Sequence, residues 1–315
     1  TEWNNRMATA SRAIAARPNN ALAHLNLGFA YYKLGDLGDA VEAYSAALRL
    51  DPHLAAAHSN LANVLFALDR LDESLASARQ AVGLRPDDAV SHYNLGRILR
   101  ELREIDAAEA SYDKAIDLDE TLASAHMNRG LLRMLRGDLE AGLPGYEWRK
   151  VKTDSRKNSD FVARPWLGEE DIAGRSILLH AEQGLGDTIQ FVRYAQLVRE
   201  RHAKVILAVP PSLIPLISRS MADIEVISVV GPVPRTDLHA HLLSLPVAFG
   251  TRLGTIPAPL GYLTADPERV EFWRERLGSH GFRIGICWQG STGELLQHNG
   301  ILEKFFKFGS SLRNS

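Results

Sequence analysis

Four asparagines recur in the first half of the sequence at a constant separation of 34 residues. Asn26, Asn60, Asn94 and Asn128 lie in four similar blocks, AHLNLG, AHSNLA, SHYNLG and AHMNRG. An asparagine amide donates and accepts hydrogen bonds at once, which suits recognition of a peptide backbone. Two interpretations stay open. Either the four amides line a binding wall, or repeat duplication copied one asparagine that has no special role.

Small residues, tyrosines and prolines recur at the same 34-residue period. This period is typical of the tetratricopeptide repeat (TPR), a helix–turn–helix unit that stacks into a solenoid. Small residues let the paired helices approach, and proline ends the second helix because it cannot continue one. The first half of the chain therefore resembles the TPR family. The predicted boundaries are a partial repeat at 1–20, repeats at 21–54, 55–88 and 89–122, and a degenerate repeat at 123–148.

A solenoid normally binds extended partners along its concave face, so a protein or peptide is the predicted partner. The asparagine spacing resembles the asparagine ladder in the TPR superhelix of the O-linked GlcNAc transferase, which holds substrate polypeptide. That resemblance implies peptide binding by the four asparagines. Histidines precede them by two residues, and we interpret these as packing residues, because no acidic or cysteine ligand accompanies them. The histidines are His24, His58, His92 and His126.

Composition limits the classes of protein that fit. The chain has 315 residues, a net charge of −2 and 45% hydrophobic residues, as expected of a soluble globular protein of two domains. It lacks the basic excess expected of a nucleic-acid-binding protein. The one cysteine, Cys287, excludes an internal disulfide framework and favours a reducing compartment, so a cytoplasmic location is predicted. No apolar run approaches the ~20 residues of a membrane span.

The pattern changes after Trp148. Residues 149–165 read as a polar linker, and from Arg175 short apolar runs alternate with amphipathic segments. We predict strands at 176–180, 204–209, 225–230 and 283–288. One helix is expected over 188–202, a short one after 210 and another at 266–278. This alternation favours a parallel sheet packed with helices, whose ligand site lies at the carboxyl ends of the strands.

The turn after the first of these strands reads HAEQGLGDT, from His180 to Thr188. Gly184 and Gly186 permit positive φ and close approach of a ligand to the backbone. The third glycine of a dinucleotide fingerprint and the Gly-Lys of a P-loop are both missing. By spacing alone, capping of the next helix by Asp187 or Thr188 explains the turn better than a ligand site does.

A wider set of segments changes this interpretation. The segments LLHAEQGLGDTIQFVRYAQLV, DLHAHLLSLPVAFGT, IPAPLGYL and RIGICWQGS resemble the glycosyltransferase-like domain, related to the lipopolysaccharide heptosyltransferases, that follows TPR arrays in many bacterial proteins. The resemblance covers 166–291 and implies a GT-B fold. It implies that Asp187 is the general base at the acceptor cleft. Gln183, Gly184 and Gly186 would belong to the acceptor loop, with His180, His239 and Ser244 nearby in no assigned role.

The predicted fold is α + α/β, a TPR α-solenoid followed by a Rossmann-like parallel-sheet domain at 166–288 that forms the N-terminal half of a GT-B fold. A GT-B enzyme binds its nucleotide-sugar donor with a second such domain. The resemblance stops at Ser291, so we expect 289–315 to be a truncated or aberrant start of that domain. No cofactor or metal is predicted, although an intact parent would use a nucleotide-sugar and an acceptor.

The predicted function is therefore that of a TPR-containing glycosyltransferase-like protein. Its array would bind a polypeptide partner or acceptor, and its α/β domain would transfer a sugar, although this fragment is expected to be inactive. The alternative is a non-catalytic TPR scaffold for protein–protein interaction.

Overall fold

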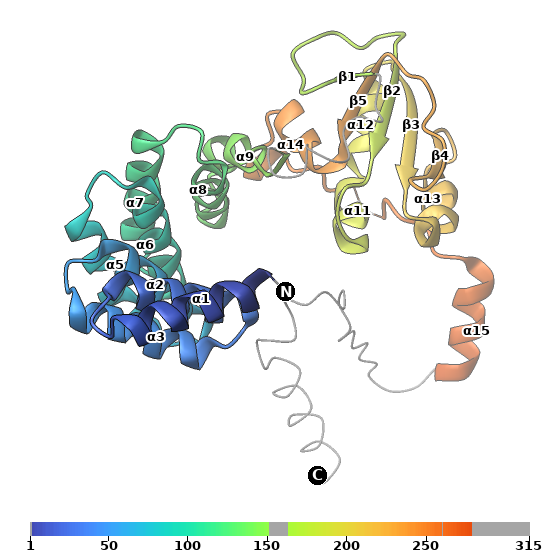
Figure 1. Ribbon diagram of the computed structural model, residues 1–315. Helices are drawn as coiled ribbons and strands as arrows, with labels where there is room; N and C mark the ends of the chain where they lie inside the picture. The colour runs from blue at the N-terminus through green and yellow to red at the C-terminus, as the bar shows by residue number, and fades with distance from the viewer. Residues whose placement is uncertain (1, 151–162, 260, 279–315) are drawn as a thin grey trace. The chain divides into compact units, whose positions relative to one another are not determined.

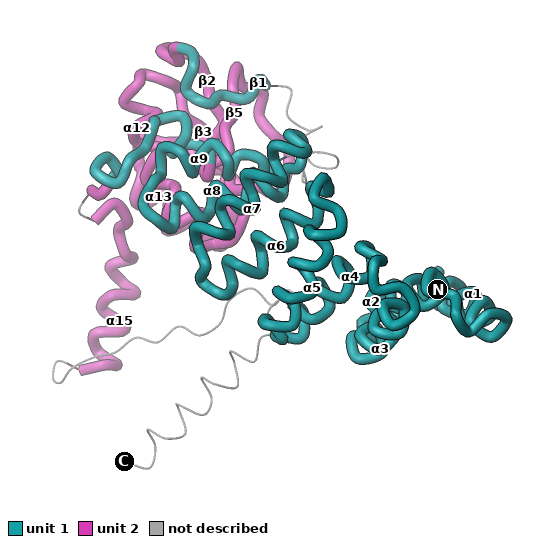
Figure 2. Tube along the Cα trace, turned by 90° about the vertical axis from the view of Figure 1, so that its left-hand side faces the viewer, with its two compact units in different colours: residues 1–170, 244–257 teal, residues 171–243, 258–315 magenta. Residues whose placement is uncertain are grey.

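The computed structural model describes residues 2–150, 163–259 and 261–278. The chain divides into two compact units (Figure 2). Unit 1 comprises Thr1–Glu170 and Ser244–Pro257, and unit 2 comprises Asp171–Leu243 and Ala258–Ser315. The strand predicted at 283–288 and the segment at 289–315 lie outside the described residues.

Unit 1 contains helices that stack in pairs (Figure 1). The first helices of the four repeats are α2 (Ala21–Leu34), α4 (Ala55–Ala67), α6 (Ala89–Glu101) and α8 (Ala123–Leu135). The second helices are α3 (Leu37–Leu50), α5 (Leu71–Leu84), α7 (Ile105–Leu118) and α9 (Leu139–Tyr146). Helix α1 (Glu2–Ala16) lies in the predicted partial repeat at 1–20 and packs on α2. The predicted helical array is confirmed.

Pairs of facing residues explain why small residues recur within the repeats. A Cβ atom added at Gly28 would lie 2.7 Å from two ring carbons of Tyr44, a separation at which atoms overlap. Gly96 faces Tyr112 in the same way two repeats later. The intervening repeat has alanine at both matching positions, Ala62 and Ala78, and both are buried. Glycine therefore stands where the facing residue is tyrosine, and alanine is tolerated where the facing residue is itself alanine.

The fourth repeat departs from the others in its ion pairs. Arg129 donates to Asp113 at 2.7 Å, and Arg133 donates to Glu109 at 2.7 Å, so both arginines of α8 bind carboxylates of α7. Helix α9 has only 8 residues, includes Pro144 and ends two residues later. The proline is accommodated near the end of the helix and does not break it at that point.

Unit 1 also includes short elements that follow the repeats. These are β1 (Arg164–Pro165), α14 (Leu245–Ala248) and η4 (Leu253–Thr255). Trp166 is buried and its ring meets that of Phe249 edge to face, with centroids 6.0 Å apart. Arg149 is also buried, and it donates to Ser244 Oγ at 2.9 Å and to Glu147 Oε1 at 2.6 Å. These contacts attach 244–257 to the end of the array.

Unit 2 contains parallel strands in the order β5-β2-β3-β4. Their bounds are β2 (Ser176–His180), β3 (Lys204–Val209), β4 (Glu225–Ser228) and β5 (Leu238–His241). The helical segments are α11 (Leu185–Phe191), α12 (Tyr194–Glu200), η2 (Pro211–Leu213), α13 (Ile214–Ser220) and α15 (Pro267–Leu277), and η3 (Leu242–Ser244) leads from β5 into unit 1. The predicted parallel sheet with helices is confirmed.

Several element boundaries differ from the predictions. Strands β2 and β3 match their predicted ranges, whereas β4 ends at Ser228, two residues early. The helix predicted over 188–202 is two helices, because the chain turns at Val192 and Arg193 so that Thr188 and Tyr194 are both buried. Strand β5 was not predicted, since its four residues alternate histidine with apolar residues in a segment followed by a proline.

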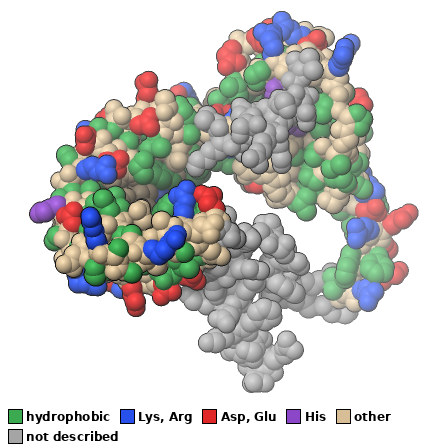
Figure 3. Space-filling view, viewed as in Figure 1, with side chains coloured by type: hydrophobic (Ala, Val, Ile, Leu, Met, Phe, Trp, Pro, Cys, Tyr) green, Lys and Arg blue, Asp and Glu red, His purple; other side chains and the backbone are tan. Residues whose placement is uncertain are grey.

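The visible surface carries charged side chains of both signs among hydrophobic and uncharged ones (Figure 3). No helix among the described residues is both long enough and apolar enough to cross a membrane.

Candidate functional site

The first helices of the repeats form one wall of the array. Successive first helices approach each other more closely than successive second helices do. A stack whose elements are closer on one side is concave on that side, so α2, α4, α6 and α8 line the concave surface. We call the exposed side of these four helices the inner wall.

The four predicted asparagines are all on first helices, but they differ in environment. Asn94 is buried and donates to Ser59 Oγ at 3.4 Å. Asn128 is buried, donates to the Ser124 carbonyl at 2.8 Å and accepts from Arg100 at 2.7 Å. These two amides therefore already take part in contacts between or within first helices.

The other two asparagines are more accessible. Asn26 is exposed and Asn60 is half-buried, and neither side chain has a hydrogen-bond partner among the described residues. Their amides retain both donor and acceptor capacity, as a peptide-binding group requires. The structure thus divides the predicted ladder into two engaged and two available positions.

Arginine and aromatic side chains join the asparagines on the inner wall, and sequence reasoning did not single them out. The Arg97 guanidinium lies 4.6 Å from the centre of the Phe66 ring and 5.9 Å from that of Tyr93. Its Nη1 also donates to Asn63 Oδ1 at 3.4 Å. The available signal was their position, because Asn63 and Arg97 occupy the same repeat position, three residues after the periodic asparagine.

The periodic histidines have a structural role. Each imidazole Nε2 lies 2.9–3.1 Å from the carbonyl oxygen of the residue six positions earlier. In three repeats that residue is the proline of the preceding turn, and in the fourth it is Glu120. This contact fixes each first helix to the loop before it. The last histidine, His126, also stacks on Trp148 with ring centroids 4.0 Å apart.

Unit 2 contains the second predicted site, the turn between β2 and α11. Neither Gly184 nor Gly186 has a positive φ, so the turn does not use the left-handed conformations that glycine permits. A Cβ atom added at Gly184 would lie 3.8 Å from Asp187 Oδ2, and one added at Gly186 would meet nothing within 4 Å. The space beside both glycines is therefore open. Gln183 is exposed. Asp187 is half-buried and has no hydrogen-bond or ion-pair partner among the described residues. Capping of α11 by the Asp187 side chain does not occur.

A histidine cluster lies at the carboxyl ends of β2 and β5. His180 and His239 are buried, and His180 Nε2 lies 3.1 Å from His239 Nδ1. The His241 ring centre is 4.2 Å from that of His180, and His241 Nδ1 lies 3.3 Å from Glu182 Oε2. The parallel register pairs His180 with His241, which explains their proximity. Within the described residues, no group of three or more His, Cys, Asp or Glu side chains has a geometry suited to a metal ion.

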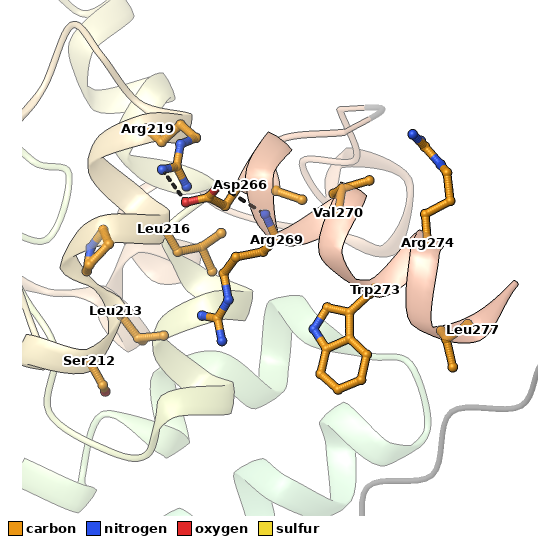
Figure 4. A pocket seen from close by; sticks show the side chains of 12 residues that line it. Ser212, Leu213, Leu216, Arg219, Asp266, Arg269, Val270, Trp273, Arg274 and Leu277 are labelled. Carbon is orange, nitrogen blue, oxygen red and sulfur yellow. Dashed lines mark hydrogen bonds and ion pairs between the residues drawn. The ribbon is translucent and has the colours of Figure 1, made fainter.

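An open hollow of about 760 Å³ lies elsewhere in unit 2, between α13 and α15 (Figure 4). Leu213 and Leu216 line one side, and Trp273 lies on the opposite side. Arg219 and Asp266 form an ion pair of 2.7 Å in its lining. None of the site residues predicted from the sequence lines this hollow.

Three protein-family models match the repeats. Residues 30–69 match a TPR repeat model, and residues 9–42 and 53–121 match two tetratricopeptide repeat models. No curated protein matches the chain.

Solved TPR structures match about half of the chain. The crystal structure of MamA is 23% identical, covers 49% of this chain and 90% of its own, and has a TM-score of 0.44. YrrB, titled a TPR protein with an unusual peptide-binding site, is 20% identical, and its match covers 48% of this chain and 78% of YrrB with a TM-score of 0.41. A thermophilic TPR protein from Thermus thermophilus is 24% identical, and its match covers 50% of this chain and 86% of that protein with a TM-score of 0.42.

The family matches cover the segment from α1 to α7, where the 34-residue period, the paired helices and the Gly–Tyr contacts also lie. The N-terminal part of this chain is a tetratricopeptide repeat array, and a parallel α/β domain follows it.

Proposed function

We propose that this protein is a binding scaffold whose TPR inner wall holds an extended polypeptide. The observation that carries the proposal is the pair of unpartnered amides of Asn26 and Asn60, which occupy the same position on the first helices of successive repeats. A peptide backbone offers alternating N–H and C=O groups, and an asparagine amide bonds to both. The Phe66 ring, which lies on the same helix as Asn60 and contacts Arg97, offers apolar contact to a bound segment.

The test uses the full chain and a display library of random 16-residue peptides. The peptides that are enriched are then measured by fluorescence anisotropy against Asn26→Ala/Asn60→Ala. We expect ~10-fold weaker binding, because two amide hydrogen bonds to the peptide are lost. Asn19→Ala, which changes an exposed asparagine outside the helices, is the matched control and should bind as the wild type does. Equal affinities for all three proteins would remove the amides from the binding role.

Sugar transfer by the α/β domain is the second candidate function. It is supported by the position of Asp187, a half-buried carboxylate without a partner among the described residues, in the turn that follows β2. In parallel α/β sheets this edge is where ligands bind. A carboxylate that is not neutralised there can remove the proton from an acceptor hydroxyl as it attacks a sugar donor. The open space beside Gly184 and Gly186 leaves room for that acceptor.

The test incubates the full chain with a panel of nucleotide-sugars and follows nucleotide release. Asp187→Asn should abolish nucleotide release without changing the thermal midpoint. Asp223→Asn, which alters an exposed carboxylate, should leave nucleotide release intact. If the wild-type chain releases no nucleotide, transfer is excluded for this chain. If Asp187→Asn keeps full turnover, another group is the base.

A further inference from the structure

Charge is divided between the two kinds of helix in the array. The first helices α2, α4, α6 and α8 carry five lysine and arginine residues and one carboxylate, Glu101. The second helices α3, α5, α7 and α9 carry nine carboxylates and three basic residues. The net charge of the whole chain, −2, conceals this division.

The basic residues of the first helices are not equivalent. Arg129 and Arg133 are neutralised by carboxylates of α7. Lys33, Arg97 and Arg100 have no carboxylate partner among the described residues. Their contacts are with rings and amides, and the Lys33 ammonium lies 5.3 Å from the Phe29 ring centre.

Arg97 and Arg100 are both half-buried and lie one turn apart on the same face of α6. Arg97 is held by Asn63 and the Phe66 ring, and Arg100 by the Asn128 amide. Those contacts fix the orientation of each guanidinium while they leave its charge uncompensated. Partly desolvated, pre-oriented guanidinium groups bind carboxylates more strongly than mobile surface cations do.

We infer that the inner wall selects an acidic polypeptide segment, with its carboxylates on Arg97 and Arg100. This inference rests on the proposed scaffold function and adds the chemistry of its partner. The negative second helices repel such a segment from the convex side, while the cations of the inner wall attract it. An apolar side chain of the segment packs on Phe66 and Tyr93 beside the arginines.

The test begins with the same display library of random 16-residue peptides on the full chain, with sequencing before and after selection. We expect enrichment of aspartate and glutamate over lysine and arginine. The best peptide should bind ~10-fold or more weakly to Arg97→Gln/Arg100→Gln, because two charge-assisted contacts are lost. Arg49→Gln/Arg79→Gln removes the same charge from exposed positions of second helices and is the matched control, with an expected change under ~2-fold.

A change on the peptide makes the test independent of how well the variants fold. Replacement of every acidic residue of the best peptide by its amide should weaken binding to the wild-type chain by a similar factor. If peptides are enriched without acidic bias, or if the amide peptide binds equally well, the charge inference fails while the scaffold function stands. If no peptide is enriched, both fail. If a 16-residue oligothymidylate binds more tightly than the best peptide, the wall recognises phosphate and the inference is wrong.

Discussion

The contact between Gly28 and Tyr44 predicts a specific effect of adding one methyl group. Gly28→Ala places a Cβ atom 2.7 Å from two ring carbons of a side chain that is fully buried. Carbon atoms prefer a separation of ~3.5–4.0 Å, so the ring must move by ~1 Å within a packed interior. Overpacking of this kind costs ~1–3 kcal/mol, while alanine gains ~1 kcal/mol over glycine in a helix. The expected net loss in the free energy of unfolding is ~0–2 kcal/mol.

A control isolates the packing contribution. Gly83 lies in helix α5, and an added Cβ there would meet nothing within 4 Å. Gly83→Ala should therefore gain ~0.5–1 kcal/mol from helix propensity alone. The two Gly→Ala variants should differ by ~1–3 kcal/mol, which is the packing contribution. Urea unfolding of the full chain, followed by far-ultraviolet circular dichroism, measures both.

The double variant Gly28→Ala/Tyr44→Ala copies the natural pair Ala62 and Ala78 of the next repeat. Tyr44→Ala alone should cost ~3–5 kcal/mol, as for other large aromatic residues in cores. Since the added methyl group then enters the vacated space, the double variant should be ~1–3 kcal/mol more stable than the sum of the single changes. Strict additivity, or a Gly28→Ala variant as stable as Gly83→Ala, would refute the packing argument.

Three further predictions concern buried polar groups and are measured by the same unfolding assay. The Tyr112 hydroxyl is buried without a partner among the described residues, so Tyr112→Phe should gain ~1 kcal/mol. Burial raises the pKa of Tyr112 from 10.0 to about 12, so the folded chain keeps a proton that the unfolded chain has lost. Stability should therefore fall between about pH 10 and 12, and this part of the fall should be absent in Tyr112→Phe. An unchanged alkaline profile would contradict that assignment. Ser74 Oγ donates to the Ala62 carbonyl at 2.7 Å, so Ser74→Ala should lose ~1 kcal/mol, and a neutral result would mean that the bond contributes nothing. Burial raises the pKa of Glu147, but the positive charges of Arg149 and a neighbouring lysine together outweigh burial and lower this pKa overall. The Glu147–Arg149 ion pair therefore stabilises the fold above about pH 4.5, and its contribution decreases as the pH falls and Glu147 takes up a proton. Arg149→Met should cost up to ~3 kcal/mol at about pH 7 and reduce that acid dependence, and equal losses at about pH 7 and about pH 3 would argue against the ion pair.

The repeats were predictable because a solenoid uses local contacts. A 34-residue period fixes which helices pair and where small residues face large ones, so Gly28, Tyr44 and the turn prolines indicated the array directly. Strands β2 and β3 were predicted for a similar reason, since each is a continuous apolar run between turn residues. Strand β5 was missed because its sequence, LHAH, alternates apolar residues with histidines, and histidine alone does not indicate a buried strand. These histidines become suitable for burial only through the pairing of β5 with the neighbouring strand.

The candidate sites were predictable only in part. Residue type and spacing indicated Asn26, Asn60, Asn94 and Asn128 as one set, because each repeat has the same local sequence. Periodicity does not reveal that Asn94 and Asn128 are buried and bonded while Asn26 and Asn60 are open. That difference depends on the residue that each amide meets in the adjacent repeat, which is Ser59 for Asn94 and Tyr93 for Asn128.

The repeat period, the helix pairs of the array and the parallel α/β character of the second half all follow from the amino-acid sequence. These properties depend on local propensity and on hydrophobic periodicity, which consecutive residues specify. Which cations are neutralised and which remain available on the inner wall depends instead on how the helices pack. Arg129 and Arg97 look alike in sequence, yet one meets a carboxylate of α7 and the other meets aromatic rings. Such pairings depend on the distance between side chains of different helices, and no period along the chain encodes that distance.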